Sequence, residues 1–181
     1  MSEPARVFFA CWPSPVLAAA IHRQALRLQQ SCKGRVMRPD TLHMTLAFLG
    51  DVERHRLPEL QAVASRLAAA PFRFGLTRQG SWHGHRIVWL APGEVPAHLH
   101  LLQASLCAEL RSAGFQLEEG SYNPHVTILR NARSAPGNAC CGDGLEWTVD
   151  AFRLVESQRL PEGASYRTLG EWPLVGLRAP E

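Results

Sequence analysis

Apolar residues along the chain follow the period of strands in some segments and the period of helices in others. The aromatic run at residues 6–12, "RVFFACW", stops before a proline and predicts a strand. A helix is expected next, because Ser14 suits an N-cap and Pro15 suits the first helical position. Gly34 marks its expected end. Its apolar positions, spaced for one buried face, are Leu17, Ile21, Ala25 and Leu28.

The remaining segments continue the same two patterns. Further strands are expected in "LHMTLAFLGD" at 42–51, from Phe72, from Arg86, in "PHVTILR" at 124–130, from Ala151 and at 165–173. Two more helices are expected, one from Pro58 with Leu60, Val63 and Leu67, and one over 96–113 with Leu99, Leu102, Leu106 and Leu110. The order of elements therefore recurs along the chain.

Matching residues in the two parts of the chain have nearly constant spacing. The offsets are 80 residues from Arg6 to Arg86, 82 from His43 to His125 and 80 from Phe72 to Phe152. They favour an internal duplication with approximate halves at 1–80 and 81–160, followed by a C-terminal strand at 165–173. The predicted fold is α+β, with two pseudo-twofold lobes in one domain. Each lobe is an antiparallel-rich sheet with helices outside, and a cleft between the lobes receives one His-x-Thr strand from each.

Each half carries a histidine and a threonine two positions apart on a predicted strand. Because side chains alternate along a strand, His43 and Thr45 share one face, and His125 and Thr127 do the same. The intervening and following residues are apolar in both copies. One such pair is explained by ordinary buried polar groups, but two at a repeated spacing favour a shared site.

Two imidazoles and two hydroxyls facing one cleft suit a specific kind of reaction. A neutral imidazole accepts a proton and an imidazolium donates one near neutral pH, so a pair can act as base and acid. Two hydroxyls can donate hydrogen bonds to oxygens that carry negative charge. A phosphodiester fits this arrangement, with two non-bridging oxygens between an attacking and a leaving oxygen. The reaction requires neither a nucleophilic side chain nor a metal ion.

Composition narrows the class of protein further. The chain has 181 residues, of which 46% are hydrophobic and 19% charged, which is typical of a packed domain. The net charge of +3 is mild, so a long phosphate-tracking surface is not indicated, although arginine suits a small anionic ligand. No signal sequence or membrane span is evident, and we expect a cytoplasmic, soluble protein.

Cysteines and the other histidines suggest no metal site. The five cysteines have no CxxC spacing, and Cys140 and Cys141 lie together in a glycine-rich loop. The "HGH" and "HLH" fragments resemble pieces of metal sites, but the first falls in an expected turn. The second falls on a helix, where residues two apart do not face each other. No metal and no cofactor are expected.

The tetrapeptides "HMTL" and "HVTI" resemble the two signatures of the 2H phosphoesterase superfamily, most closely those of the RNA 2′,3′-cyclic phosphodiesterases, once named 2′-5′ RNA ligases. The segments "LHMTLAFLGDV", "GSWHGHRIVWLA", "PHVTILRNA" and "YRTLGEW" extend the resemblance, although "HGH" departs from it. The resemblance implies a bilobal fold and metal-independent hydrolysis of 2′,3′-cyclic phosphates to 2′-phosphates. It implies that His43 donates a proton to the leaving oxygen, that His125 accepts one from water, and that Thr45 and Thr127 hold the phosphoryl oxygens.

Three further residues are candidates for substrate binding. Arg130 resembles a family position that contacts phosphate, but regular alternation would place it on the face of Val126. It reaches the site only if the strand ends, bulges or twists near Leu129. Phe9 and Tyr122 are candidates for stacking on a base, with a place in the core as the alternative.

Two alternative functions remain open at the level of sequence. The same residues can run the reverse reaction and join RNA ends through a 2′-5′ bond, without ATP because no phosphate-binding GxxxxGK[ST] loop is present. A non-catalytic module that binds nucleotides or RNA ends is the other. The expected partners are RNA termini or small cyclic nucleotides, no protein partner is evident, and a monomer is expected because one chain completes the site.

Overall fold

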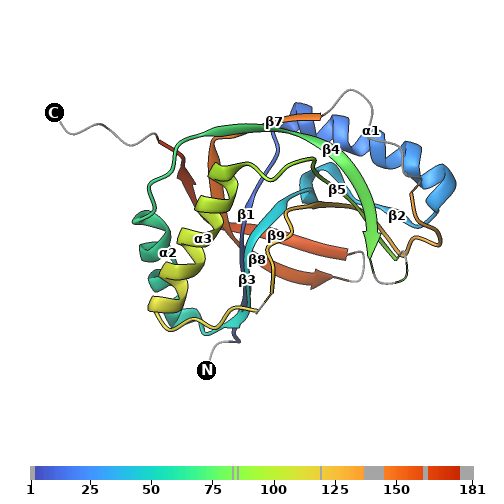
Figure 1. Ribbon diagram of the computed structural model, residues 1–181. Coiled ribbons are helices and arrows are strands. Elements are labelled where there is room, and N and C mark those ends of the chain that lie inside the picture. Colours follow the sequence, from blue (N-terminus) through green and yellow to red (C-terminus); the bar gives the residue numbers. More distant parts are fainter. Residues whose placement is uncertain are drawn as a thin grey trace.

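The computed structural model describes residues 3–82, 84, 86–118, 120–136, 145–160 and 163–175, which form an α+β fold (Figure 1). The strands are β1 (Ala5–Cys11), β2 (Arg35–Val36), β3 (Met44–Val52), β4 (Phe72–Trp82), β5 (Ile87–Pro92), β6 (Val126–Arg130), β7 (Leu145–Val149), β8 (Ala151–Leu160) and β9 (Gly163–Pro173). The helices are α1 (Pro15–Cys32), α2 (Leu57–Ser65) and α3 (Ala97–Ser112), with short 3₁₀ turns η1 (Pro39–Thr41) and η2 (Arg54–Arg56). The expected α+β class with antiparallel sheet is confirmed.

The described strands belong to one antiparallel sheet whose order is β7-β4-β5-β6-β3-β1-β8-β9, with β2 beside β6. The order is symmetric about the boundary between β6 and β3. Counted outwards from that boundary, β6 and β3 come first on their two sides, β5 and β1 second, and β4 and β8 third. These are the pairs of segments that the offsets of 80 and 82 residues connect. The duplication therefore stays our interpretation, with a strand order that agrees with it. The sheet is continuous, whereas the sequence suggested two separate sheets.

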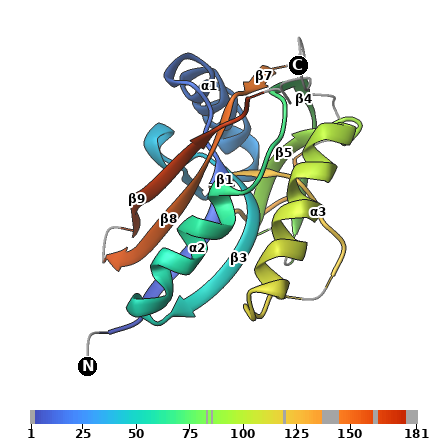
Figure 2. The ribbon, with the colours of Figure 1, turned by 90° about the vertical axis from the view of Figure 1, so that its left-hand side faces the viewer.

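The two halves of the sheet meet at a single residue pair. Met44 of β3 lies opposite Val126 of β6, and both side chains are fully buried. The helices cross this boundary, because α1 follows β1 yet contacts β6 and β7, while α3 follows β5 yet contacts β3. Figure 1 shows α2 and α3 together at one end of the molecule and α1 at the other, and Figure 2 gives the same arrangement from the side. One core cluster consequently spans both halves.

Local sequence explains where α1 begins and ends. The Ser14 side chain accepts a hydrogen bond from the Leu17 amide at 3.3 Å, which confirms the predicted N-cap. The chain leaves the helix at Lys33, whose φ is 57°, and Gly34 follows with φ of +89°. A Cβ on Gly34 would lie 2.7 Å from the Arg130 carbonyl oxygen, so only glycine allows the next segment to run against β6.

Most of the expected elements are present, with small shifts of their ends. The helix expected from Pro58 is α2, and the helix expected over 96–113 is α3, on which the four leucines predicted to form its apolar face are buried. The expected closing strand at 165–173 is β9, which begins two residues earlier. Sequence reasoning missed β2 and β7, which have two and five residues. None of the described helices has the length and apolar character needed to cross a membrane.

Candidate active site

The two His-x-Thr segments lie side by side at the centre of the sheet. His43 immediately precedes β3 and His125 immediately precedes β6, and the Met44 and Val126 pair holds the two strands together. In each segment the histidine and the threonine are partly accessible, whereas the residues between and after them are buried. A cavity of about 120 Å³ is lined by Met37, Thr41, His43, Thr45, His125, Thr127 and Arg130. The structure thus brings the four signature residues into one site.

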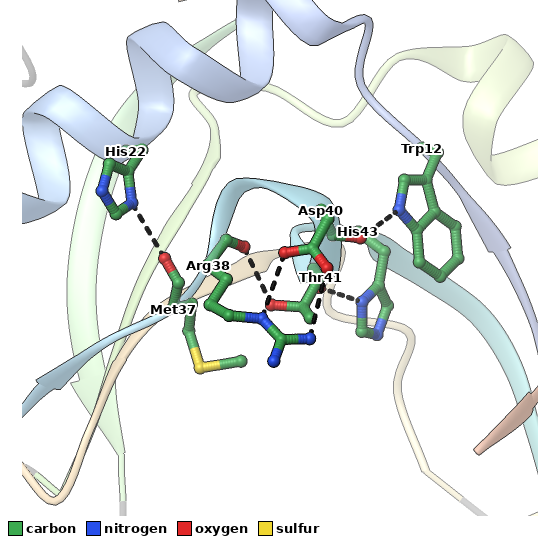
Figure 3. Close-up of polar contacts among 7 residues, drawn as sticks. All are labelled: Trp12, His22, Met37, Arg38, Asp40, Thr41 and His43. Atoms are coloured by element: carbon green, nitrogen blue, oxygen red, sulfur yellow. Dashed lines mark hydrogen bonds and ion pairs between the residues drawn. The ribbon is translucent and has the colours of Figure 1, made fainter. Parts of the chain in front are cut away.

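Each imidazole is fixed by the same backbone contact. The Nδ1 atom of His43 lies 2.8 Å from the carbonyl oxygen of Thr41, and Nδ1 of His125 lies 2.8 Å from the carbonyl oxygen of Asn123 (Figure 3 shows the first). A carbonyl oxygen only accepts, so Nδ1 carries the proton that makes each bond. In the neutral rings Nε2 is therefore unprotonated and is the atom available for proton exchange.

The surroundings of both imidazoles disfavour their charged forms. Burial lowers the pKa of His43 to about 4, with smaller contributions from His125 and Arg130, although the hydrogen bond to Thr41 opposes the shift. Burial also lowers the pKa of His125, and Arg130 adds to this, while the bond to Asn123 opposes it. Both rings are therefore neutral at pH 7, and an anion placed between them would favour protonation.

Arg130 reaches the site through a β-bulge. In the pairing of β6 with β5, Thr127 lies opposite Trp89 and Leu129 opposite Val88, so Ile128 is an extra residue. Ile128 and Leu129 are consequently both buried, and alternation resumes with Arg130 on the side of Thr127. The sequence analysis required an irregularity near Leu129 for Arg130 to reach the site. The structure has this bulge at Ile128, one residue earlier.

The first half carries the same irregularity at the same place. In the pairing of β3 with β1, Thr45 lies opposite Ala10 and Ala47 opposite Phe9, so Leu46 is the extra residue. Both bulges thus follow the threonine directly. The residue equivalent to Arg130 is Phe48, which lies five positions after its histidine and also faces a cavity next to the site.

The two residues expected to stack on a base have different environments. Phe9 is fully buried among Phe152 and Trp172, so it presents no ring face to a ligand and its expected role does not fit the structure. Tyr122 is partly exposed beside His125, and its hydroxyl donates a hydrogen bond to the Thr45 carbonyl oxygen at 3.3 Å. That bond joins the two halves, and base stacking by Tyr122 stays a prediction.

Aromatic side chains around both histidines were missed by the sequence reasoning. Trp12 stacks on His43 with ring centroids 4.8 Å apart, and Tyr166 meets the same imidazole edge-on at 5.2 Å. Trp82 meets His125 edge-on at 4.3 Å. Alternation along β1 offered a signal for Trp12, because Ala10 faces Thr45 and Trp12 lies two positions further along the same face.

The other candidate residues lie away from this site or outside the described part. His98 and His100 belong to α3, as expected. His83, His85, Cys140 and Cys141 lie outside the described residues. Within the described ranges, no group of three His, Cys, Asp or Glu side chains has a metal-binding arrangement.

A family model and several curated proteins match this chain over most of its length, and all of them belong to one family. A family model described as the 2′-5′ RNA ligase superfamily matches residues 13–160. The chain is 32% identical to the RNA 2′,3′-cyclic phosphodiesterase of Escherichia coli K12 over 176 residues, covering 97% of this chain and 99% of that protein. It is 33% identical to the protein of the same name from Thermus thermophilus, covering 94% of this chain and 91% of that one.

Solved structures agree with these sequence matches. E. coli LigT in complex with 3′-AMP superposes with a TM-score of 0.87 at 30% identity, over 95% of this chain and 99% of that one. The same protein in complex with phosphate superposes with a TM-score of 0.83 at 29% identity, over 96% and 99% of the two chains.

Proposed function

Because the chain belongs to the 2′-5′ RNA ligase superfamily of 2H phosphoesterases, we propose that it hydrolyses 2′,3′-cyclic phosphodiesters at RNA termini or in nucleotides to 2′-phosphates. The observation that carries the proposal is the paired site, in which two imidazoles present Nε2 and two threonines line one cavity. The matching names of the E. coli and T. thermophilus relatives support the same substrate class.

In the proposed mechanism the reaction is a single displacement at phosphorus. Nε2 of His125 takes a proton from water while the water oxygen bonds to phosphorus, and the bond from phosphorus to O3′ breaks. Protonated His43 gives its proton to O3′, so the products are a 3′-hydroxyl and a 2′-phosphate. This division of roles between the two histidines rests on the family resemblance, because both imidazoles make the same hydrogen bond through Nδ1 and both leave Nε2 free for proton exchange.

The remaining polar side chains stabilise the phosphoryl group. Thr45 and Thr127, one from each half, both line the cavity, and in the proposed mechanism their hydroxyls donate hydrogen bonds to the two non-bridging oxygens. Arg130 supplies positive charge next to them. The same anion that these groups bind would raise the pKa values of both imidazoles, which burial holds low. Substrate binding thus prepares one of them to act as an acid.

The test is hydrolysis of adenosine 2′,3′-cyclic phosphate in the presence of EDTA, with the position of the product phosphate identified by NMR. We expect the 2′-phosphate, and a loss of about three orders of magnitude or more in kcat for His43→Ala and for His125→Ala. His100→Ala, an exposed histidine on α3, is the matched control and keeps wild-type activity. A 3′-phosphate product, near-normal rates in either active-site variant, or inactivation by EDTA would contradict the proposal.

The same assay distinguishes the two alternatives. If the protein binds a 2′-phosphate but turns over no cyclic phosphate, it is a binding module. If an added RNA with a 5′-hydroxyl is joined faster than the cyclic phosphate is hydrolysed, ligation is the principal reaction.

One chain carries both signature strands, so we propose a monomer as the active unit. Light scattering under assay conditions measures the molar mass that checks this. A cytoplasmic location stays a prediction.

A further inference from the structure

A second and larger cavity adjoins the catalytic one. Its volume is about 420 Å³, within the range of about 300–1,000 Å³ that small-molecule sites occupy. It shares Met37, Thr41, His43, Thr45 and Arg130 with the catalytic cavity. The residues that only the larger cavity has are Arg6, Phe8, Arg35, Arg38, Phe48, Ser157, Ala164 and Tyr166. The larger cavity therefore begins at the same histidine, threonines and arginine that line the catalytic cavity.

One wall of this cavity is a sheet face and the other is a connecting segment. The sheet wall consists of side chains from β1, β3, β8 and β9. The segment wall is residues 35–41, which run along β6 because the Met37 amide donates to the Ile128 carbonyl at 2.9 Å. His22 of α1 contacts the Met37 carbonyl at 2.9 Å, and Trp12 donates to the Asp40 carbonyl at 3.2 Å (Figure 3). Contacts at both ends thus hold this wall in place.

Four guanidinium groups line the cavity, and two of them have no carboxylate partner among the described residues. Arg35 and Arg130 are direct cross-strand neighbours, and neither forms an ion pair within the part of the chain that the structure describes. Like charges opposite each other destabilise a sheet unless an anion lies between or beside them. Arg38 pairs with Asp40 at 3.2 Å but is 53% exposed, and Arg6 is 3.8 Å from Asp51.

The positive charge extends beyond the place of the cyclic phosphate. On β1, Ala10 pairs with Thr45, and Arg6 lies four residues away on the same face, about 13 Å along the strand. Phe8, Phe48 and Tyr166 line the space between, and the Arg6 guanidinium lies 4.8 Å from the centre of the Phe48 ring. Alternating arginine and aromatic side chains are typical of sites that bind single-stranded nucleic acid.

We propose that this cavity binds the phosphate on the 5′ oxygen of the nucleotide that carries the cyclic phosphate, through Arg38 and Arg6. The inference rests on the proposed function and narrows it, because it makes the preferred substrate a 2′,3′-cyclic phosphate whose nucleotide also carries a phosphate on its 5′ oxygen. In an RNA chain this phosphate is the backbone link to the preceding nucleotide. Arg130 contacts the cyclic phosphate that reacts, and Arg35 adds positive charge between the cyclic phosphate and the phosphate on the 5′ oxygen.

The experiment compares three substrates that differ only at the 5′ oxygen. They are adenosine 2′,3′-cyclic phosphate, the same nucleotide with a 5′-phosphate, and the dinucleotide ApA 2′,3′-cyclic phosphate. We expect the KM of both extended substrates to be about tenfold lower than that of the first, as charge-assisted hydrogen bonds to one phosphate would give. In Arg6→Gln, in Arg38→Gln and in the double variant, the ratio of KM values should fall towards one.

A matched control separates this effect from net charge. Arg73→Gln removes one positive charge on β4, where Arg73 pairs with Glu146 and lines neither cavity, and should keep the wild-type ratio of KM values. The ratio is measured within each variant, so a partly folded preparation does not change it. Raising the salt concentration should reduce the advantage of the extended substrates, because screening weakens contacts to phosphate.

The outcomes distinguish this inference from the function on which it rests. If all three substrates are hydrolysed with equal KM, the cavity does not bind the 5′-phosphate and the proposed function still stands. If only the dinucleotide gains, the cavity recognises the preceding nucleoside and the phosphate assignment is wrong. It is equally wrong if the double variant keeps the wild-type ratio. If no substrate is hydrolysed, both proposals fail.

Discussion

The indole ring of Trp12 lies almost flat against the imidazole of His43, with ring centroids 4.8 Å apart and planes 19° from parallel. Its Nε1 donates a hydrogen bond to the Asp40 carbonyl, one residue before the carbonyl of Thr41 that fixes His43 Nδ1 (Figure 3). The ring of His43 is therefore held at one edge by the backbone and on one face by Trp12. Trp12 acts through His43, as a positioning residue.

We expect Trp12→Ala to lower kcat about tenfold with a smaller change in KM, because the imidazole loses the surface that fixes its plane. Removing the indole also lets water reach His43, so the lowered pKa of that group should rise towards its ordinary value. His43 would then stay protonated to higher pH, and the pH profile of kcat/KM should shift to higher pH. Trp12→Phe restores a ring against His43 and should recover most of kcat. A profile unchanged in Trp12→Ala would exclude this role.

The dependence of the reaction on pH should differ between the free enzyme and its complex. The pKa of His43 is about 4 and that of His125 is below its ordinary value, so one protonated and one neutral ring coexist only at acidic pH. We therefore expect kcat/KM, which reports the free enzyme, to be maximal below about pH 6.5. The bound phosphodiester favours both imidazolium forms, so the maximum of kcat should lie at higher pH. Initial rates over substrate concentration at each pH measure both, and coincident maxima would contradict the prediction.

Sequence periodicity predicted the central strands and all three helices because each buries a continuous apolar face. Leu99, Leu102, Leu106 and Leu110 keep helical spacing, and all four are buried on α3. The repeated offset of 82 residues also identified His43 and His125 as partners. These features depend on local pattern or on direct repetition, which a sequence displays.

Register and long-range placement could not be predicted in the same way. The bulges at Leu46 and Ile128 arise from how β3 and β6 pair with their neighbours, and nothing in "TLAF" or "TILR" distinguishes a bulged strand from a regular one. Phe9 was expected near a base, but the register of β1 places Phe8 at the cavity and Phe9 in the core. Tyr166 comes from a strand more than 100 residues from His43, so only the sheet order brings them together.

The division of roles between the two histidines can be tested with a better leaving group. In a cyclic phosphorothiolate whose 3′ bridging atom is sulfur, the leaving thiolate is a weak base and needs little help from a general acid. If His43 is the acid, His43→Ala should recover much of its lost rate on this substrate relative to the oxygen substrate. His125→Ala should remain as slow as before, because water still needs a base. Recovery by His125→Ala instead would reverse the assignment.

Glu156 of β8 makes a prediction about stability that is separate from catalysis. Its side chain is 3% exposed and accepts hydrogen bonds from Arg54 at 2.6 Å and from Arg167 at 2.6 Å. Burial opposes its charged form, but the hydrogen bonds and charges of the two arginines outweigh this and hold the pKa of Glu156 below its ordinary value. The carboxylate thus joins η2, β8 and β9 near the N-terminal end of β1.

A carboxyl group whose pKa is lower in the folded state stabilises the fold above its unfolded pKa, and this contribution is lost as pH falls through the folded pKa. We therefore expect Glu156→Gln to lower the free energy of unfolding at pH 7 by about 1–3 kcal/mol, because the neutral amide cannot satisfy both arginines. The difference from wild type should shrink as pH falls below the ordinary pKa of glutamate and through the lower folded pKa of Glu156, because the protonated carboxyl no longer pairs with the arginines. Urea unfolding of both proteins at pH 7 and pH 3.5 measures the difference in the free energy of unfolding.

Glu146→Gln is the matched control, because it removes a carboxylate that is 53% exposed beside Arg73. It should change the free energy of unfolding by less than about 0.5 kcal/mol at either pH. An equal loss in both variants would show that Glu156 contributes no more than a surface ion pair does.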